Sequence, residues 1–181
     1  EVGHTLGLNH NFKGSYLHNN EDVHNPEITS KVGVTASVME YPAINLAPLG
    51  VEQGDYYDTI PGPYDIWAIK YGYTPGLNEE QLAEIIAEQN KPEHMFANDS
   101  EDMRSPGRGI DPRAMINDLT NDPITYAINR IELINHTQKN IVTKLADTAE
   151  TFEEYRLALS IFMREYSRQL EVISRHIGGV Y

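Results

Sequence analysis

A glutamate, a glycine and two histidines stand at regular intervals in the first ten residues of the sequence. Glu1, His4, Gly7 and His10 match the pattern H-E-x-x-H-x-x-G-x-x-H from its second letter onward. On a helix, a histidine directly before Glu1 would lie one turn from His4 on the same face, where both imidazoles reach one zinc ion. Gly7 would let the chain bend sharply, so that His10 becomes a third ligand and water takes the fourth position.

Glu1 stands where a general base is needed. Next to the first ligand position, it would accept a proton from the attacking water and later pass it to the leaving amine. The sequence opens without Met in the middle of a helical pattern, so we expect it to be a piece of a longer protein with His before Glu1. With only His4 and His10 present, the 181-residue chain is expected to bind zinc weakly or not at all and to lack peptidase activity.

A second element lies downstream at a loop-like distance, in Ser37-Val38-Met39-Glu40-Tyr41. It resembles the Met-turn of the metzincins, in the Ser-x-Met-x-Tyr form of the astacin and serralysin families. The resemblance implies that Met39 forms an apolar floor under the zinc histidines. It also implies that Tyr41 is a switchable zinc ligand that swings away to hydrogen-bond the oxyanion. Without the zinc pattern before it, Met39 would read as an ordinary core residue.

The third element is Asp65-Ile66-Trp67-Ala68-Ile69-Lys70-Tyr71-Gly72, which looks like the helix after the Met-turn in serralysin-like enzymes. Together the elements are most similar to a bacterial met-zincin family of large zinc-dependent metallopeptidases. The resemblance covers residues 1–75 and implies the C-terminal half of a metzincin catalytic domain. It also implies an upstream subdomain whose edge strand pairs with an extended peptide substrate. An extracytoplasmic location, whether periplasmic, surface or secreted, follows from the resemblance alone.

Composition limits the other possibilities. With 14 Lys and Arg against 27 Asp and Glu, the net charge of -13 argues against a nucleic-acid partner. The absence of cysteine leaves His, Asp and Glu as the strong metal ligands. No stretch is long and apolar enough to cross a membrane.

The elements that must hold the site are predicted to be mainly α. The zinc helix ends at Gly7, and a long polar loop follows from Asn9 to Ser37. Helices are expected over 64–71 and over 78–89, the second capped by Asn78 with Gln81 and burying a stripe of Leu82, Ile85 and Ile86. An irregular stretch over 94–120 marks a domain seam, and residues 76–181 form a helical extension.

The extension is predicted to end in an antiparallel helix hairpin. Its first helix is capped by Asp122, with Pro123 at the first position, and its second by Thr151 with Glu154 completing a capping box. The expected buried faces, by helical spacing, are Ile124, Ile128, Ile131, Ile134, Ile141 and Leu145 on the first, and Phe152, Tyr155, Leu159, Phe162, Tyr166, Leu170, Ile173 and Ile177 on the second.

Several other groups have plain interpretations. His18 and His24 are expected to be solvated loop residues rather than metal ligands, and His94, His136 and His176 structural or exposed. A set of acidic residues lacks the spacing of an EF-hand and is expected to form a solvated surface: Asp99, Glu101, Asp102, Asp111, Asp118 and Asp122. The segment Pro42–Leu49 either walls the pocket for the substrate residue after the cut, as the metzincin resemblance implies, or is a connecting loop.

The sequence therefore favours a zinc metalloendopeptidase that cleaves peptide or protein substrates. One alternative is a binding module that keeps the fold without catalysis. Another makes residues 76–181 a helical platform for a partner, with the zinc region as its scaffold.

Overall fold

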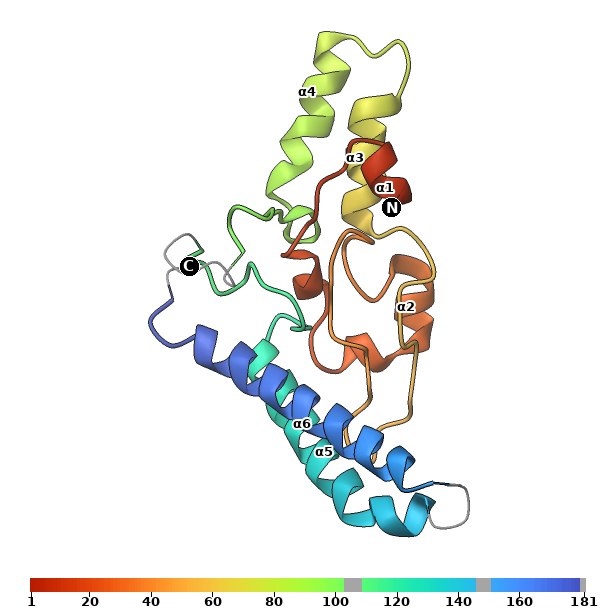
Figure 1. Cartoon of the computed structure of the whole chain (residues 1–181). Helices are drawn as coiled ribbons and strands as arrows, with labels where there is room; N and C mark the ends of the chain where they lie inside the picture. The colour runs from red at the N-terminus through yellow and green to blue at the C-terminus, as the bar shows by residue number, and fades with distance from the viewer. Residues whose placement is uncertain (103–108, 146–150, 180–181) are drawn as a thin grey trace.

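The computed structural model describes residues 1–102, 109–145 and 151–179, and every regular element in these ranges is a helix. The short helix α1 lies near α3 at one end of an elongated molecule, where α4 packs on α3, and α5 and α6 form the other end (Figure 1). Loops and 3-10 turns fill the middle. The predicted mainly α architecture is confirmed.

The α-helices are α1 (Val2–Thr5), α2 (Pro26–Val32), α3 (Pro63–Tyr73), α4 (Glu79–Ala87), α5 (Pro123–Leu145) and α6 (Phe152–Arg175). The 3-10 turns are η1 (Gly14–Leu17), η2 (Asp22–His24), η3 (Glu88–Asn90) and η4 (Pro92–His94). Helices were predicted at the positions of α1, α3, α4, α5 and α6.

The segment predicted as one long loop contains α2, which corrects that expectation. The side chain of Asn25 accepts a hydrogen bond from the backbone N–H of Glu27 at 3.0 Å and Pro26 takes the first helical position. These are standard signals for a helix start. The polar composition around them hid a helix that buries Thr29.

Helices α3 and α4 pack through one indole. Trp67 donates its ring N–H to the carbonyl of Ile85 at 2.8 Å and stacks on His94 with ring centroids 4.8 Å apart. Asn78 and Gln81 form the predicted capping box. The expected stripe on α4 was partly wrong, because Ile86 is 39% exposed while Ile85 is buried. A single neighbouring helix covers only a narrow face of α4.

Helices α5 and α6 pack against each other as the predicted hairpin. On α5, however, Ile124 and Ile128 are exposed, and the buried face turns toward Tyr126 and Arg130 instead. Tyr126 reaches away from the hairpin into the core around Leu119, and its hydroxyl donates to the carbonyl of Ile44 at 3.1 Å. Both the loops and α6 pack on α5, and together they determine which of its residues are buried.

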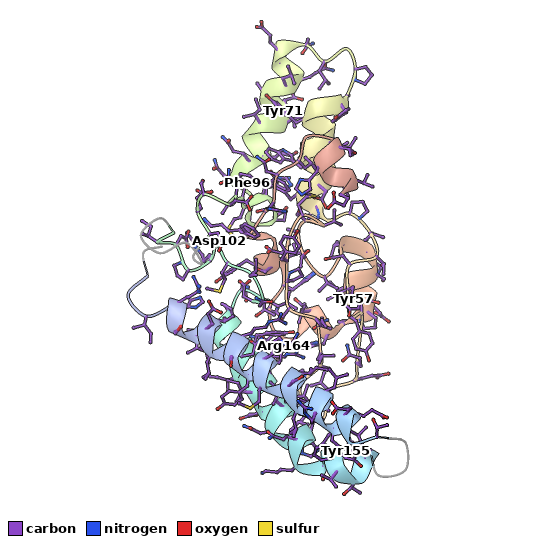
Figure 2. The ribbon with its side chains drawn as sticks, in the orientation of Figure 1. Tyr57, Tyr71, Phe96, Asp102, Tyr155 and Arg164 are labelled. Carbon is purple, nitrogen blue, oxygen red and sulfur yellow. The ribbon has the colours of Figure 1, made fainter. Side chains whose placement is uncertain are left out.

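The face predicted for α6 is also corrected in part. Phe152, Leu159, Leu170 and Ile177 are exposed, whereas Gln169 and Val172 are buried. The tip of the hairpin, marked by Tyr155, extends away from the rest of the molecule (Figure 2). Within the described part of the hairpin, exposed apolar side chains near that tip include Phe152 and Leu157.

The irregular segment after η4 lies against the first part of the chain. Ala43 donates its backbone N–H to Asp118 at 3.1 Å, and Thr120 donates to Ser15 at 2.9 Å. Phe96, labelled in Figure 2, stacks on Tyr64 of α3 with ring centroids 5.6 Å apart. The boundary at residue 75 stays a prediction, and these bonds join residues on both sides of it.

Among the described residues, no helix is long and apolar enough to span a bilayer.

Candidate metal centre

The chain turn at Gly7 brings His4 and His10 together. Gly7 has φ +84°, a conformation that favours glycine, and it follows directly on the end of α1. The backbone N–H of Leu8 then donates to the carbonyl of Gly3 at 3.0 Å. The two imidazole rings lie edge to face with centroids 4.8 Å apart. The predicted bend is confirmed, and it produces the juxtaposition that a shared metal ion requires.

Each ring engages a partner through Nδ1. In His4 that atom lies 2.9 Å from the carbonyl oxygen of Leu8, and in His10 it lies 2.9 and 3.0 Å from the two carboxylate oxygens of Asp99. A carbonyl or carboxylate oxygen only accepts, so each Nδ1 carries the proton. In the neutral form of each ring, Nε2 then has the lone pair. Neutral imidazoles with Nε2 lone pairs are the donors that zinc takes.

Met39 lies directly against the zinc helix. It is 5% exposed, and a Cβ added to Gly3 would collide with its sulfur. The backbone N–H of Asn11 donates to the Met39 carbonyl at 3.1 Å, which ties the strand-like stretch after His10 to the same turn. A buried thioether packed against Gly3 of α1 fits the Met-turn interpretation, and it leaves Gly3 no room for a side chain.

The turn around Met39 is held from α3 by one carboxylate. Asp65 accepts from the Ser37 hydroxyl at 2.6 Å and from the backbone N–H of Val38 at 2.8 Å. The Ser37 hydroxyl oxygen in turn accepts from the backbone N–H of Met39 at 3.1 Å. Asp65 is 3% exposed. The aspartate of the third sequence element thus fixes the second.

Tyr41 and Glu1 lie at the open side of the cluster. The ring of Tyr41 is 5.0 Å from that of His10, and 54% of Tyr41 is exposed. Glu1 is the exposed N-cap of α1, and its carbonyl accepts from Thr5 at 3.2 Å. Both residues are exposed to solvent, and Tyr41 lies beside His10.

A buried pair of carboxyl groups lies behind Met39 and was not predicted. The backbone N–H of Ser15 donates to Glu40 at 3.1 Å, and the Ser15 hydroxyl donates to Asp118 at 3.0 Å. Burial raises the pKa of both groups, and the charge of Asp118 adds to the shift of Glu40. Within the described residues, Oδ1 of Asp118 has no hydrogen-bond partner. Burial of the pair therefore favours the protonated form of both carboxyl groups.

The predictions for the loop histidines and the acidic surface need correction. His18 and His24 are buried rather than solvated, and burial lowers the pKa of His24. Asp102 and Asp118 are also buried. These side chains fill the interior because the loops carry few large apolar residues. His94 is structural, as expected, and stacks on Trp67.

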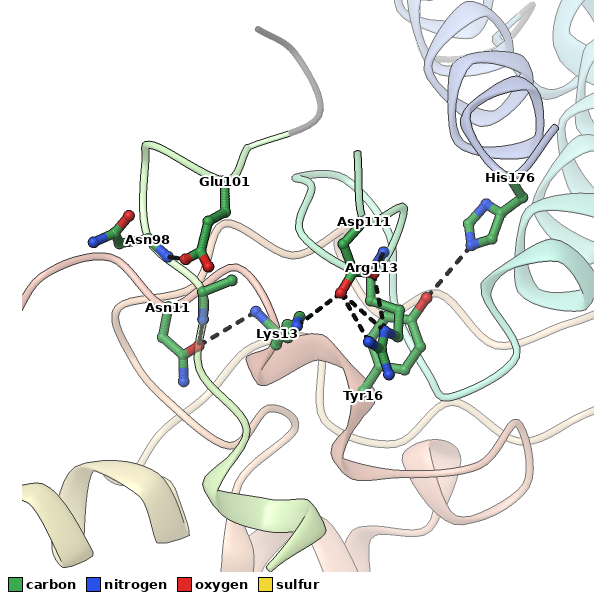
Figure 3. A network of polar contacts seen from close by, with 9 residues as sticks. Asn11, Lys13, Tyr16, Asn98, Glu101, Asp111, Arg113 and His176 are labelled. Atoms are coloured by element: carbon green, nitrogen blue, oxygen red, sulfur yellow. Dashed lines mark hydrogen bonds and ion pairs between the residues drawn. The ribbon is translucent and has the colours of Figure 1, made fainter. Parts of the chain in front are cut away.

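Asp111, another member of the acidic set, forms ion pairs with two basic side chains. Figure 3 shows Asp111 between Lys13 and Arg113, at 2.8 Å from each, and the Tyr16 hydroxyl 3.4 Å from Nε2 of His176. Although burial acts in the opposite direction, hydrogen bonds from Arg113 and Lys13 hold the pKa of Asp111 below its usual value. These contacts tie the extension to the turn that follows His10.

The described residues contain no group of three or more His, Cys, Asp or Glu side chains that could hold a metal ion. The imidazoles of His4 and His10 lie together, and a third metal ligand would have to come from another residue. In a comparison with protein families, the Met-zincin family matched residues 1–181. The chain belongs to the Met-zincin family. No curated protein and no solved structure matched it.

Membership of the Met-zincin family relates the chain to metallopeptidases, whose catalytic members use zinc. The match extends beyond residues 1–75, where the catalytic resemblance was seen, to the whole helical extension. The extension is thus part of what the family shares.

Proposed function

We propose that the full-length protein hydrolyses peptide bonds with a zinc ion held by His4, His10 and a histidine directly before Glu1. The observation that carries this proposal is the His4–His10 pair, with ring centroids 4.8 Å apart and both Nδ1 atoms already engaged. The sulfur of Met39 lies against Gly3 of the helix that carries His4. Two histidines with a purely structural role would not require rings this close with both Nδ1 atoms hydrogen-bonded.

Zinc bound there would act as a Lewis acid that makes a water acidic and polarises the scissile carbonyl. Glu1 would take the proton of the attacking water and deliver it to the leaving amine. The Tyr41 hydroxyl would donate a hydrogen bond to the oxygen on which charge develops. Met39 keeps the region beneath the histidines apolar, and its rigid turn holds Tyr41 in place through the backbone.

The substrate would be an extended peptide or protein segment, and an upstream subdomain of the same protein would complete the cleft. Pro42–Leu49 follows Tyr41 directly, and Ile44 and Leu49 in it are 45% and 50% exposed. Ile44, however, lines a groove with Ile134 of α5 and Phe162 of α6, so the proposal that this segment receives the substrate residue after the cut rests on the metzincin resemblance. An extracytoplasmic location is proposed on the same family basis.

Peptide cleavage by the full-length protein and its Glu1→Gln variant tests the function. Gln keeps the shape of Glu but cannot act as a base, so turnover should fall by about a thousandfold or more while zinc content is unchanged. Glu27→Gln, on the exposed side of α2, is the matched control and should keep full activity. Equal turnover of wild type and Glu1→Gln would refute the mechanism, and an inactive wild type would favour a silent binding module.

A further inference from the structure

His10 of the candidate site contacts Asp99, which lies far along the chain in the helical extension. The residues are 89 positions apart, and Nδ1 of His10 lies 2.9 and 3.0 Å from the two Asp99 oxygens. The His10 side chain is 21% exposed and that of Asp99 is 64% exposed. Asp99 belongs to the helical extension, for which the sequence indicated no catalytic role.

Backbone pairing delivers Asp99 to this position. Phe12 donates its N–H to the carbonyl of Ala97 at 2.8 Å, and the side-chain amide of Asn11 donates to the carbonyl of Met95 at 3.0 Å. Asn11 also accepts from the N–H of Ala97 at 3.3 Å through its side-chain oxygen. The stretch after His10 and residues 95–97 therefore run side by side.

The turn that carries Asp99 is closed by its own bonds. Glu101 accepts from the backbone N–H of Asn98 at 2.9 Å, a contact drawn in Figure 3, and Asn98 accepts from the N–H of Ser100 at 3.0 Å. Local bonds of this kind limit the directions that the Asp99 side chain can take. Hydrogen bonds made by the residues before and after Asp99 thus support its contact with His10.

An imidazole has one proton to place on two nitrogens. In the neutral ring, a hydrogen bond from Nδ1–H to the Asp99 carboxylate leaves Nε2 with a lone pair, and the ring itself lies 4.8 Å from that of His4. A histidine without such a partner can place its proton on either nitrogen and can rotate. A carboxylate behind a metal-binding imidazole also makes the ring a stronger donor.

We propose that Asp99 is the positioning residue for His10: it fixes the Nδ1–H tautomer and the ring orientation that metal binding needs. The inference rests on the proposed zinc function. It gives residues 76–181 a part in the metal centre, since the residue that orients a ligand comes from the extension. The partner-docking alternative treats that region as separate from the site.

The test compares full-length wild type with Asp99→Ala, Asp99→Asn and Glu93→Gln. Zinc affinity is measured by competition with a chelator, and the tautomer of His10 by nitrogen NMR of the metal-free 181-residue chain. Asp99→Ala should weaken zinc binding by about tenfold to a hundredfold and release the Nδ1–H tautomer. Asp99→Asn keeps an acceptor oxygen and should lose less, and Glu93→Gln, on η4, should change neither quantity.

Each result has a defined meaning. A graded loss in the order wild type, Asn, Ala, together with the tautomer change, supports the inference. Zinc affinity of Asp99→Ala within twofold of wild type overturns it, whatever the tautomer. A wild-type protein that binds no zinc overturns the proposed function first, and the inference with it.

Discussion

The carboxylate of Asp65 accepts the hydroxyl proton of Ser37 at 2.6 Å, which fastens the Met-turn to the first turn of α3. Its second oxygen accepts from the backbone N–H groups of Val38 at 2.8 Å and Gly62 at 3.0 Å. One buried carboxylate thus accepts hydrogen bonds from three donors, two in the Met-turn and one at the start of α3. The position of Met39 under the zinc helix depends on it.

Asp65→Asn should destabilise the protein. The amide keeps the size of the carboxylate but replaces one acceptor oxygen by an N–H donor that faces other donors, and a buried donor without an acceptor costs about 1 to 3 kcal/mol. Urea unfolding should show a free energy of unfolding lower by that amount, and so a lower midpoint. Glu84→Gln, on the exposed face of α4, should leave the midpoint unchanged. Equal midpoints for wild type and Asp65→Asn would refute the role of this carboxylate.

Gly3 and Gly72 form a matched pair of helical glycines. A Cβ at Gly3 meets the sulfur of Met39, whereas a Cβ at Gly72 meets no atom within 4 Å. Gly72→Ala should stabilise the chain by about 0.5 to 1 kcal/mol, because alanine is the better helix former. Gly3→Ala should instead displace Met39 and lower stability by about 1 to 3 kcal/mol. Thermal unfolding of both variants checks the opposite signs.

Asp118 should make stability fall with rising pH. Burial raises its pKa from 3.8 to about 8, so the protonated form contributes stability that is complete below pH 3.8 and is lost as the pH rises toward 8. Asp118→Asn stays neutral throughout. Its stability relative to wild type should therefore increase between pH 5 and pH 8, by at most about 1.4 kcal/mol per pH unit. Urea unfolding at both pH values measures this, and a constant difference would contradict it.

Tyr41→Phe should lower turnover without removing zinc from the full-length protein. Loss of one hydrogen-bond donor to a developing oxyanion costs about a hundredfold to a thousandfold in kcat. The aromatic ring that packs 5.0 Å from His10 is retained in Phe, so folding should be unaffected. Tyr57→Phe, at an exposed tyrosine, is the control. Unchanged kcat for Tyr41→Phe would exclude a role for its hydroxyl.

Features that depend on neighbours in sequence were predictable. Asn78 caps α4 through the N–H of Gln81 at 2.8 Å, three residues away, and the bend at Gly7 brings His4 to His10 within one short motif. Both follow from local geometry and residue type. The missed helix α2 also had a local signal in Asn25 and Pro26, which polar surroundings obscured.

Features set by distant partners were not predictable. The isoleucine pattern of α5 suggested a face with Ile124 and Ile128, but Tyr126 is buried because the loops supply its pocket. Likewise, the contact between His10 and Asp99 depends on how residues 95–97 pair with Asn11 and Phe12. A single sequence carries no record of such pairings. The metal-binding roles of His4 and His10 stay predictions.

Zinc content of the purified full-length protein decides whether His4 and His10 bind the metal. Metal analysis should find about one zinc per wild-type chain and a small fraction of that in His4→Ala and His10→Ala, since each removes a ligand. His136→Ala, at an exposed position on α5, should keep the metal. Wild-type protein without zinc, or His4→Ala and His10→Ala variants that retain it fully, would contradict the account.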